Sequence, residues 1–144
     1  MMLIFLAVFL VLVLGLMGAG WAASAFLAAP PRILPGRDPR QAGLDFESVA
    51  FPASDKLKLK GWWIPCRQTN APPASVIFVH PLGGNRGGLP ASAWALLRRA
   101  NREIDYLPLA ARLHDVGFNV LLFDLRGHGE SAPGHCAGGL NEDQ

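Results

Sequence analysis

The sequence has little net charge, few cysteines and no strongly basic segment. Its 144 residues include 13 Lys and Arg against 11 Asp and Glu, for a net charge of +2. No run of basic residues is interleaved with aromatic ones, so we expect no nucleic-acid partner. The two cysteines, Cys66 and Cys136, are too few for a disulfide framework. They leave one disulfide or two free thiols open.

Charged side chains are missing altogether from residues 1–31, and residues 3–29 are almost wholly apolar. A helix of that length exceeds the roughly 20 residues that cross a bilayer. We therefore expect residues 1–29 to form a transmembrane helix or signal anchor, with residues 3–29 in contact with lipid. A helix buried in a soluble protein is one alternative. A cleaved signal peptide is another, although its basic n-region is absent and only Ala23-Ser24-Ala25 fits a cleavage site.

Prolines are dense in residues 30–43, which we expect to form an extended linker to a folded part at residues 44–144. Three arginines follow the apolar run: Arg32, Arg37 and Arg40. Flanking Lys and Arg residues stay inside the cell, so these three favour a cytoplasmic folded part. Asp38 weakens that preference, and the side of the membrane stays open.

Two segments alternate between apolar and polar residues as strands do. We expect an antiparallel hairpin at a sheet edge, formed by Asp45–Phe51 and Leu57–Pro65 and turning through residues 53–56. In its second strand, alternation assigns Leu57, Leu59 and Trp63 to one face and Lys58, Lys60 and Trp62 to the other. Both tryptophans are expected to serve packing rather than binding.

Two helices are expected further along the chain. Residues 87–102 have helical spacing, and they predict a lid, a surface helix or a basic face on anionic lipid. That helix would carry Trp94, Leu97 and Ile104 on its apolar side. Residues 107–116 predict the second helix, with Asp105 as its cap and Gly117 as its left-handed stop. Its buried stripe is expected to be Leu109, Leu113 and Val116.

Two short apolar runs, residues 75–79 and 119–123, each end abruptly in a polar, glycine-rich turn. Such runs are typical of strands that helices bury on both faces of a parallel sheet. With the helix between them they form a strand, crossover, strand unit. The fold class is therefore α/β, and ligands are expected at the strand ends.

The two turns resemble those of the α/β-hydrolase superfamily, in particular serine aminopeptidase and monoacylglycerol-lipase-like hydrolases with an N-terminal membrane segment. The first resembles an H-G-x-G-G loop at His80, Gly83 and Gly84, with Pro81 in place of glycine. The second matches D-x-R-G-x-G-x-S at Asp124, Arg126, Gly127, Gly129 and Ser131, with His128 inside it. The resemblance implies a partial hydrolase sheet: the hairpin plus two parallel strands and their crossover helix, preceded by one transmembrane helix.

Hydrolases of this family place the nucleophile in a G-x-S-x-G elbow after a strand, and no serine of this sequence has that surrounding. Ser131 comes nearest, but Pro133 takes the last glycine position. Cys136 fits the pattern with cysteine, yet a turn precedes it, so we do not favour it as the nucleophile. The loop histidines lack paired metal-ligand spacing, and neither a metal nor a cofactor is expected.

By resemblance, the backbone N–H near Leu82 is the donor for the oxyanion, His80 braces its loop, and Asp124 comes too early to be the triad acid. The resemblance implies hydrolysis of an ester or amide bond, in a small molecule or a peptide, through a serine nucleophile. We expect the chain to stop before the triad and to be inactive alone. A non-enzymatic, membrane-bound interaction module is the alternative.

Overall fold

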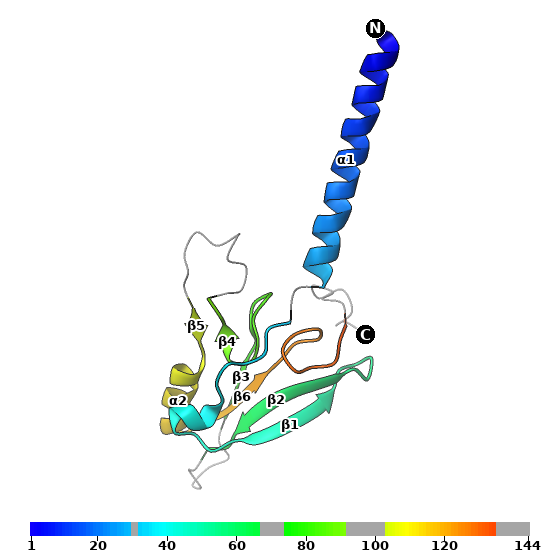
Figure 1. Cartoon of the computed structure of the whole chain (residues 1–144). Helices are drawn as coiled ribbons and strands as arrows, with labels where there is room; N and C mark the ends of the chain where they lie inside the picture. Colours follow the sequence, from blue (N-terminus) through cyan, green and yellow to red (C-terminus); the bar gives the residue numbers. More distant parts are fainter. Residues whose placement is uncertain (30–31, 67–73, 92–102, 135–144) are drawn as a thin grey trace.

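A long apolar helix and a small mixed sheet are the two main parts of the chain, and the helix stands away from the sheet (Figure 1). The computed structural model describes residues 1–29, 32–66, 74–91 and 103–134. The elements in chain order are α1 Met2–Ala28, η1 Pro39–Ala42, β1 Glu47–Pro52, β2 Lys58–Ile64, β3 Ser75–Phe78, β4 Gly88–Leu89, β5 Ile104–Asp105, α2 Leu107–Asp115 and β6 Asn119–Phe123.

Helix α1 is apolar on every side rather than on one face. It has 27 residues, no charge in its first or last turn, and exposed side chains along most of its length. Its first 24 residues, Met2–Ala25, are long and apolar enough to cross a membrane, with a mean hydropathy of 2.9 and none of that window buried. A membrane span and a signal sequence both fit this composition.

The sheet has four strands in the order β1-β2-β6-β3. Strands β1 and β2 form the predicted antiparallel hairpin, and β2 pairs antiparallel with β6. Strand β3 runs parallel to β6 in the register Val76 with Val120 and Phe78 with Leu122. Both the edge hairpin and the parallel pair are confirmed, and α2 is the helix of the predicted crossover.

Helix α2 covers one face of the sheet and forms the core with it. The buried residues of this core are Leu44, Trp62, Ile64, Leu107, Ala110, Val120 and Leu122. Trp62 therefore packs, as expected, and it meets Phe46 edge-on at 5.8 Å between ring centroids. Trp62 and Ile64 share the face of β2 that packs into this core, because alternate strand residues point to the same side. Leu59, on the opposite face, is buried as well.

The predicted buried stripe of α2 is wrong at two of its three positions. Leu109 is 48% exposed and Val116 is 67% exposed, whereas Leu107 and Ala110 face the core. A small alanine lets the helix approach the sheet closely, and the stripe lies accordingly on the Leu107 side. Asp105 accepts a hydrogen bond from the Leu107 N–H at 3.0 Å, and Gly117 has the expected positive φ, at 99°.

The helix expected over residues 87–102 is contradicted where the structure describes it. Gly88 and Leu89 form β4, which pairs antiparallel with β5 at Asp105 and Ile104. Ile104 therefore lies in a strand rather than on a helix face. Residues 92–102, including Trp94 and Leu97, lie outside the described residues.

The other face of the sheet carries apolar side chains that no described element covers. Ile77 is 59% exposed and Val79 is 58% exposed, and Ile77 is paired with Leu121, which is paired in turn with Trp63 on the next strand. Strand β3 is also the edge of the sheet. An apolar edge strand with unpaired backbone groups is a site where another strand can add.

Strands β2 and β6 approach each other closely at Gly61. A Cβ at this position would lie 2.8 Å from the Leu122 carbonyl oxygen and 3.0 Å from the Phe123 Cβ, both on the neighbouring strand. We expect Gly61→Ala to lower the free energy of unfolding by about 1–3 kcal/mol, because the strands must move apart. Denaturant unfolding followed by tryptophan fluorescence measures this.

Gly36 provides the matched control for this substitution. Nothing lies within 4 Å of a Cβ built there, so Gly36→Ala should leave stability nearly unchanged. Equal stability of the two variants would contradict the close approach of β2 and β6.

Candidate functional site: the loops after β3 and β6

Two loops meet at the carboxyl ends of the parallel strands. We call residues 79–87 the β3 loop and residues 124–131 the β6 loop. Their strands pair in register, so their exits lie side by side at one edge of the sheet, where ligands of parallel sheets bind. Every family-motif residue expected from the sequence lies in one of these loops.

A pair of buried histidines ties the loops together reciprocally. His80, in the β3 loop, accepts a hydrogen bond from the Leu125 N–H at its Nε2, 3.1 Å away. His128, in the β6 loop, accepts one from the Gly83 N–H at its Nε2, 3.3 Å away. Their rings lie 4.9 Å apart, and the side chains are 3% and 1% exposed.

The other ring nitrogen of each histidine contacts a backbone carbonyl of its own loop. His80 Nδ1 lies 2.9 Å from the Pro81 oxygen, and His128 Nδ1 lies 2.9 Å from the Arg126 oxygen. A carbonyl can only accept, so Nδ1 carries the proton and Nε2 is left as an acceptor, which is the neutral imidazole. Burial lowers the pKa of His80 below its ordinary value, and the hydrogen bond with Pro81 opposes this.

Asp124 is a second link between the loops. Its fully buried carboxylate accepts the Arg86 N–H at 2.6 Å and the Glu130 N–H at 2.9 Å, one from each loop. The Arg86 guanidinium lies 3.5 Å from the same carboxylate. Gly129 passes so close that a Cβ there would lie 2.2 Å from the carboxyl carbon, and its φ is +47°. Glycine is needed there on both counts.

The Ser131 side chain forms hydrogen bonds with two backbone groups. Its Oγ donates to the Asp124 carbonyl at 2.6 Å and accepts the Lys60 N–H at 2.9 Å, and the residue is fully buried. A hydroxyl held in this way has no room for a substrate, and the elbow that a nucleophile needs is absent. The structure therefore gives Ser131 a bracing position between the β6 loop and β2.

Arg126 and Gly127 fix the outer part of the β6 loop. The Arg126 guanidinium pairs with Asp55 of the β1–β2 turn at 2.8 Å. The pKa of Asp55 is lowered by a hydrogen bond from the Leu57 N–H and by Arg126. The Gly127 N–H donates to the Ala132 carbonyl at 3.1 Å.

Arg86 belongs to this site, although no pattern in the sequence pointed to it. It is 6% exposed, its guanidinium lies 4.4 Å from the Trp62 ring centroid, and it donates to Glu130 at 2.6 Å. That hydrogen bond holds the pKa of Glu130 below its ordinary value. Cation–π contact and ion pairing together compensate the burial of a guanidinium. Sequence reasoning missed Arg86 because its partners are 24 to 44 residues distant along the chain.

The tip of the β3 loop presents a backbone donor. The Gly84 N–H closes a turn onto the Pro81 carbonyl at 2.9 Å, and Gly83 has the positive φ of 78° that such a turn needs at its third position. The N–H groups from Gly83 to Gly88 all donate to acceptors in the two loops or to the Gly88 carbonyl at the start of β4. The N–H of Leu82 has no acceptor among the described residues, and the residue is 38% exposed.

Among the described residues, no group of three His, Cys, Asp or Glu side chains lies close enough together to hold a metal ion. His128 has both ring nitrogens engaged. Cys136 and His135 lie outside the described residues, so the cysteine nucleophile stays an alternative that the sequence does not favour.

Comparison with known proteins agrees with this geometry. No protein-family model matches the chain. A crystal structure of an esterase from Pyrococcus furiosus matches 81% of it with a TM-score of 0.57 and 29% identity, covering 37% of the esterase. Another crystal form of the same esterase gives a TM-score of 0.55 over 78% of the chain. The chain is related to the α/β hydrolases. Its sheet and two loops are a partial α/β-hydrolase fold.

Two curated relatives of this hydrolase-like chain are called uncharacterized proteins. The uncharacterized protein YfhR of Escherichia coli K12 is 33% identical over 118 residues, which are 82% of this chain and 35% of YfhR. YfhR of Salmonella typhimurium is 36% identical over 100 residues, which are 67% of this chain and 28% of YfhR. The chain thus spans about a third of the length of the curated relatives it matches.

The His80 geometry predicts a dependence of stability on pH. The folded pKa of His80 lies below its ordinary value of 6.5, so the unfolded chain binds the proton more readily. Stability is then fully present above the unfolded pKa and is lost as the pH falls below it toward the folded pKa. We expect the free energy of unfolding to decrease between about pH 7.5 and about pH 5.5.

His80→Gln removes the titrating group from the folded and unfolded chain alike. This variant should be less stable at the upper pH and should show a shallower decrease over the same interval. An unchanged slope in a variant that still unfolds cooperatively would contradict the role of His80.

Proposed function

We propose that this chain forms the N-terminal portion of a membrane-anchored α/β hydrolase that cleaves ester or amide bonds through a serine nucleophile outside these residues. The observation that carries the proposal is the likeness to the Pyrococcus furiosus esterase at 29% identity over 81% of this chain. Helix α1, long and apolar enough to span a membrane, supports the anchor. Serine aminopeptidase-like chemistry is the finer expectation from the loop motifs.

In this proposal the part described here supplies the oxyanion donor and the frame that holds it. The Leu82 N–H is the one donor at the tip of the β3 loop without an acceptor among the described residues. Preorganised N–H groups stabilise the negative charge that develops on the carbonyl oxygen in acyl transfer. The reciprocal histidines and Asp124 hold this turn in place, so the donor needs no reorganisation during the reaction.

The test is a chimera of the whole chain followed by the part of the Pyrococcus furiosus esterase that comes after its matched segment. We expect hydrolysis of a p-nitrophenyl ester by the chimera and no turnover by this chain alone. In the chimera, Leu82→Pro should lower kcat by about 100- to 1,000-fold, because it removes one oxyanion donor. Proline suits the second position of the turn, so the turn itself should persist.

Leu82→Ala is the matched control, because it shortens the same side chain and keeps the N–H. It should lose far less activity than Leu82→Pro. Equal losses in two variants that both unfold cooperatively would contradict the oxyanion role, and a folded chimera without turnover would contradict the hydrolase function.

A non-enzymatic interaction module is the second candidate, and the open edge of the sheet favours it. Among the described strands, β3 has a neighbour on one side only, and Ile77 is exposed on the face that no described element covers. A partner strand could add there by β-augmentation. We expect Ile77→Lys to reduce self-association of the detergent-solubilised chain in sedimentation velocity, because charge on an edge strand opposes pairing.

Val116→Lys is the control for this experiment, since Val116 is 67% exposed but caps the end of α2 and belongs to no strand of the sheet. It should leave self-association unchanged. A chain that stays monomeric without any substitution would count against the interaction module.

A further inference from the structure

The linker after α1 is fastened to both loops of the site. The Arg32 guanidinium donates to the Gly129 carbonyl at 2.9 Å and also to the Ser131 carbonyl, both in the β6 loop. Asn85 of the β3 loop donates its side-chain N–H to the Ile33 carbonyl at 3.1 Å. Arg37 pairs with Asp105 of β5. The segment expected to be a spacer is thus part of the folded unit.

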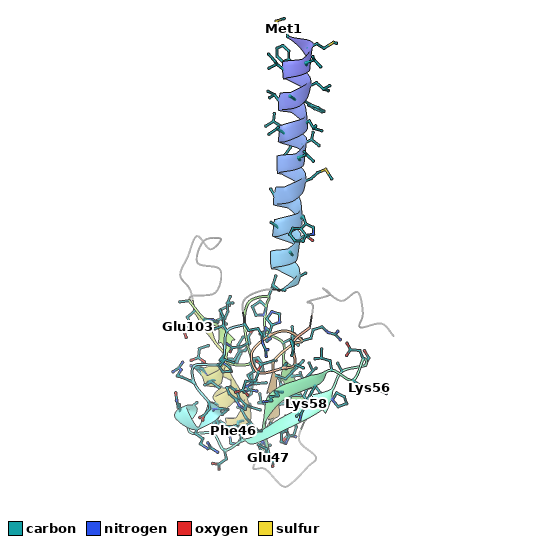
Figure 2. The ribbon with its side chains drawn as sticks, turned by 45° about the vertical axis from the view of Figure 1, so that its right-hand side comes forward. Met1, Phe46, Glu47, Lys56, Lys58 and Glu103 are labelled. Atoms are coloured by element: carbon teal, nitrogen blue, oxygen red, sulfur yellow. The ribbon has the colours of Figure 1, made fainter. Side chains whose placement is uncertain are left out.

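This attachment places the site close to the end of α1. Arg32 follows Ala29, the residue that caps the helix, by three positions. Three residues span at most about 11 Å, so the β6 loop lies near the level at which a membrane-spanning α1 would leave the bilayer. Figure 2 shows Glu103, next to β5, on the side from which α1 rises, and Phe46 and Glu47 on the far side.

A cavity of about 320 Å³ lies on this side, between the linker and the β4–β5 hairpin. Its apolar lining consists of Ile33, Leu34, Leu89, Pro90, Ile104 and Leu107. Leu34 is 62% exposed and Ile104 is 41% exposed, although both border the cavity. Large apolar side chains that stay in water around a hollow mark a binding surface rather than a core.

Arg37, Asn85, Glu103 and Asp105 are the polar side chains of the same cavity. Arg37 and Asp105 pair with each other, and the Asn85 side chain bonds to the linker and to Gly87. Three of these four polar side chains are therefore satisfied by the protein itself, and the fourth, Glu103, is exposed. The cavity therefore suits an apolar ligand that needs few hydrogen bonds from its walls.

We propose that this cavity binds the acyl chain of a lipid drawn from the bilayer, so that the ester presented to the loops is a membrane lipid. The proposal rests on the proposed membrane anchor and hydrolase function. It adds a substrate class to them: an amphiphile whose tail lies between the linker and β4–β5. The bilayer is the source because the linker that forms one wall comes directly from α1.

The test uses the whole chain reconstituted in phosphatidylcholine vesicles that contain a phosphatidylcholine with a diazirine on its acyl chain. After illumination, peptide mapping by mass spectrometry locates the lipid adducts. We expect adducts in α1 and, separately, at the cavity wall in residues 33–34 and 104–107. Adducts in α1 alone would overturn the cavity proposal and leave the anchor intact. Absence of adducts from α1 would overturn the anchor and the cavity proposal together.

Two substitutions distinguish an occupied cavity from mere nearness to lipid. Ile104→Gln and Leu34→Gln each place an amide in the cavity lining, and both positions are exposed enough to fold with glutamine. Wall adducts should fall by about five-fold or more, because an amide is disfavoured beside an acyl chain without a hydrogen-bond partner. Adducts in α1 should not change.

Val116→Gln is the matched control, since it changes an exposed apolar residue outside the cavity. It should leave wall adducts at the level of the unmodified chain. Wall adducts that resist both cavity substitutions, or that fall equally in Val116→Gln, would overturn the proposal. The esterase chimera is an independent readout, so failure of hydrolysis and failure of lipid binding are distinguishable.

Discussion

The buried carboxylate of Asp124 is the constraint on which the arrangement of the two loops depends. A carboxylate removed from water is strongly unfavourable unless donors surround it. Here the backbone N–H groups of Arg86 and Glu130 donate to the carboxylate, and the guanidinium of Arg86 is its ion-pair partner. Because these donors come from different loops, the carboxylate is satisfied only when the loops stand at one distance from each other. The histidine pair adds two more bonds across the same gap.

In this arrangement almost every motif side chain that could react with a substrate is already hydrogen-bonded within the protein. The Ser131 hydroxyl and both imidazoles are engaged with backbone atoms, and the Asp124 carboxylate is enclosed. What is left facing outward is the turn at Leu82, whose position follows from the groups behind it. In the proposed function, the two loops hold the Leu82 turn in place, and the reactive groups of the hydrolase come from outside the described residues.

Much of the fold was predictable from the sequence because its signals are local. The alternation of the β1–β2 hairpin, the two apolar runs of β3 and β6 and the glycine that ends α2 each lie within a few residues. The buried side of α2 was not predictable in this way, since Leu109 and Leu107 are equally apolar and only the sheet decides which one is covered. The segment expected as a helix at residues 87–102 begins instead as β4, because Gly88 and Leu89 pair with a distant strand.

The site shows the same division between local and distant information. The motif residues were recognisable one by one, but their partners were not: Gly83 bonds to His128, and His80 bonds to Leu125, each across 45 positions. Arg86 carries no motif and is defined only by Trp62, Asp124 and Glu130 around it. Interactions of this kind come from topology, which sets two loops side by side, rather than from any pattern that a single segment contains.

The bonds of Arg32 have a consequence for the length of the linker. Surface connections usually tolerate insertions and deletions, but this one is held at Arg32, Ile33 and Arg37 by three different parts of the folded unit. Adding or removing one residue near Arg32 would shift it by about 3.5 Å and take its guanidinium out of register with the Gly129 and Ser131 carbonyls. The number of residues between α1 and the sheet is thus fixed by these contacts, as the register of a strand is fixed by its hydrogen bonds.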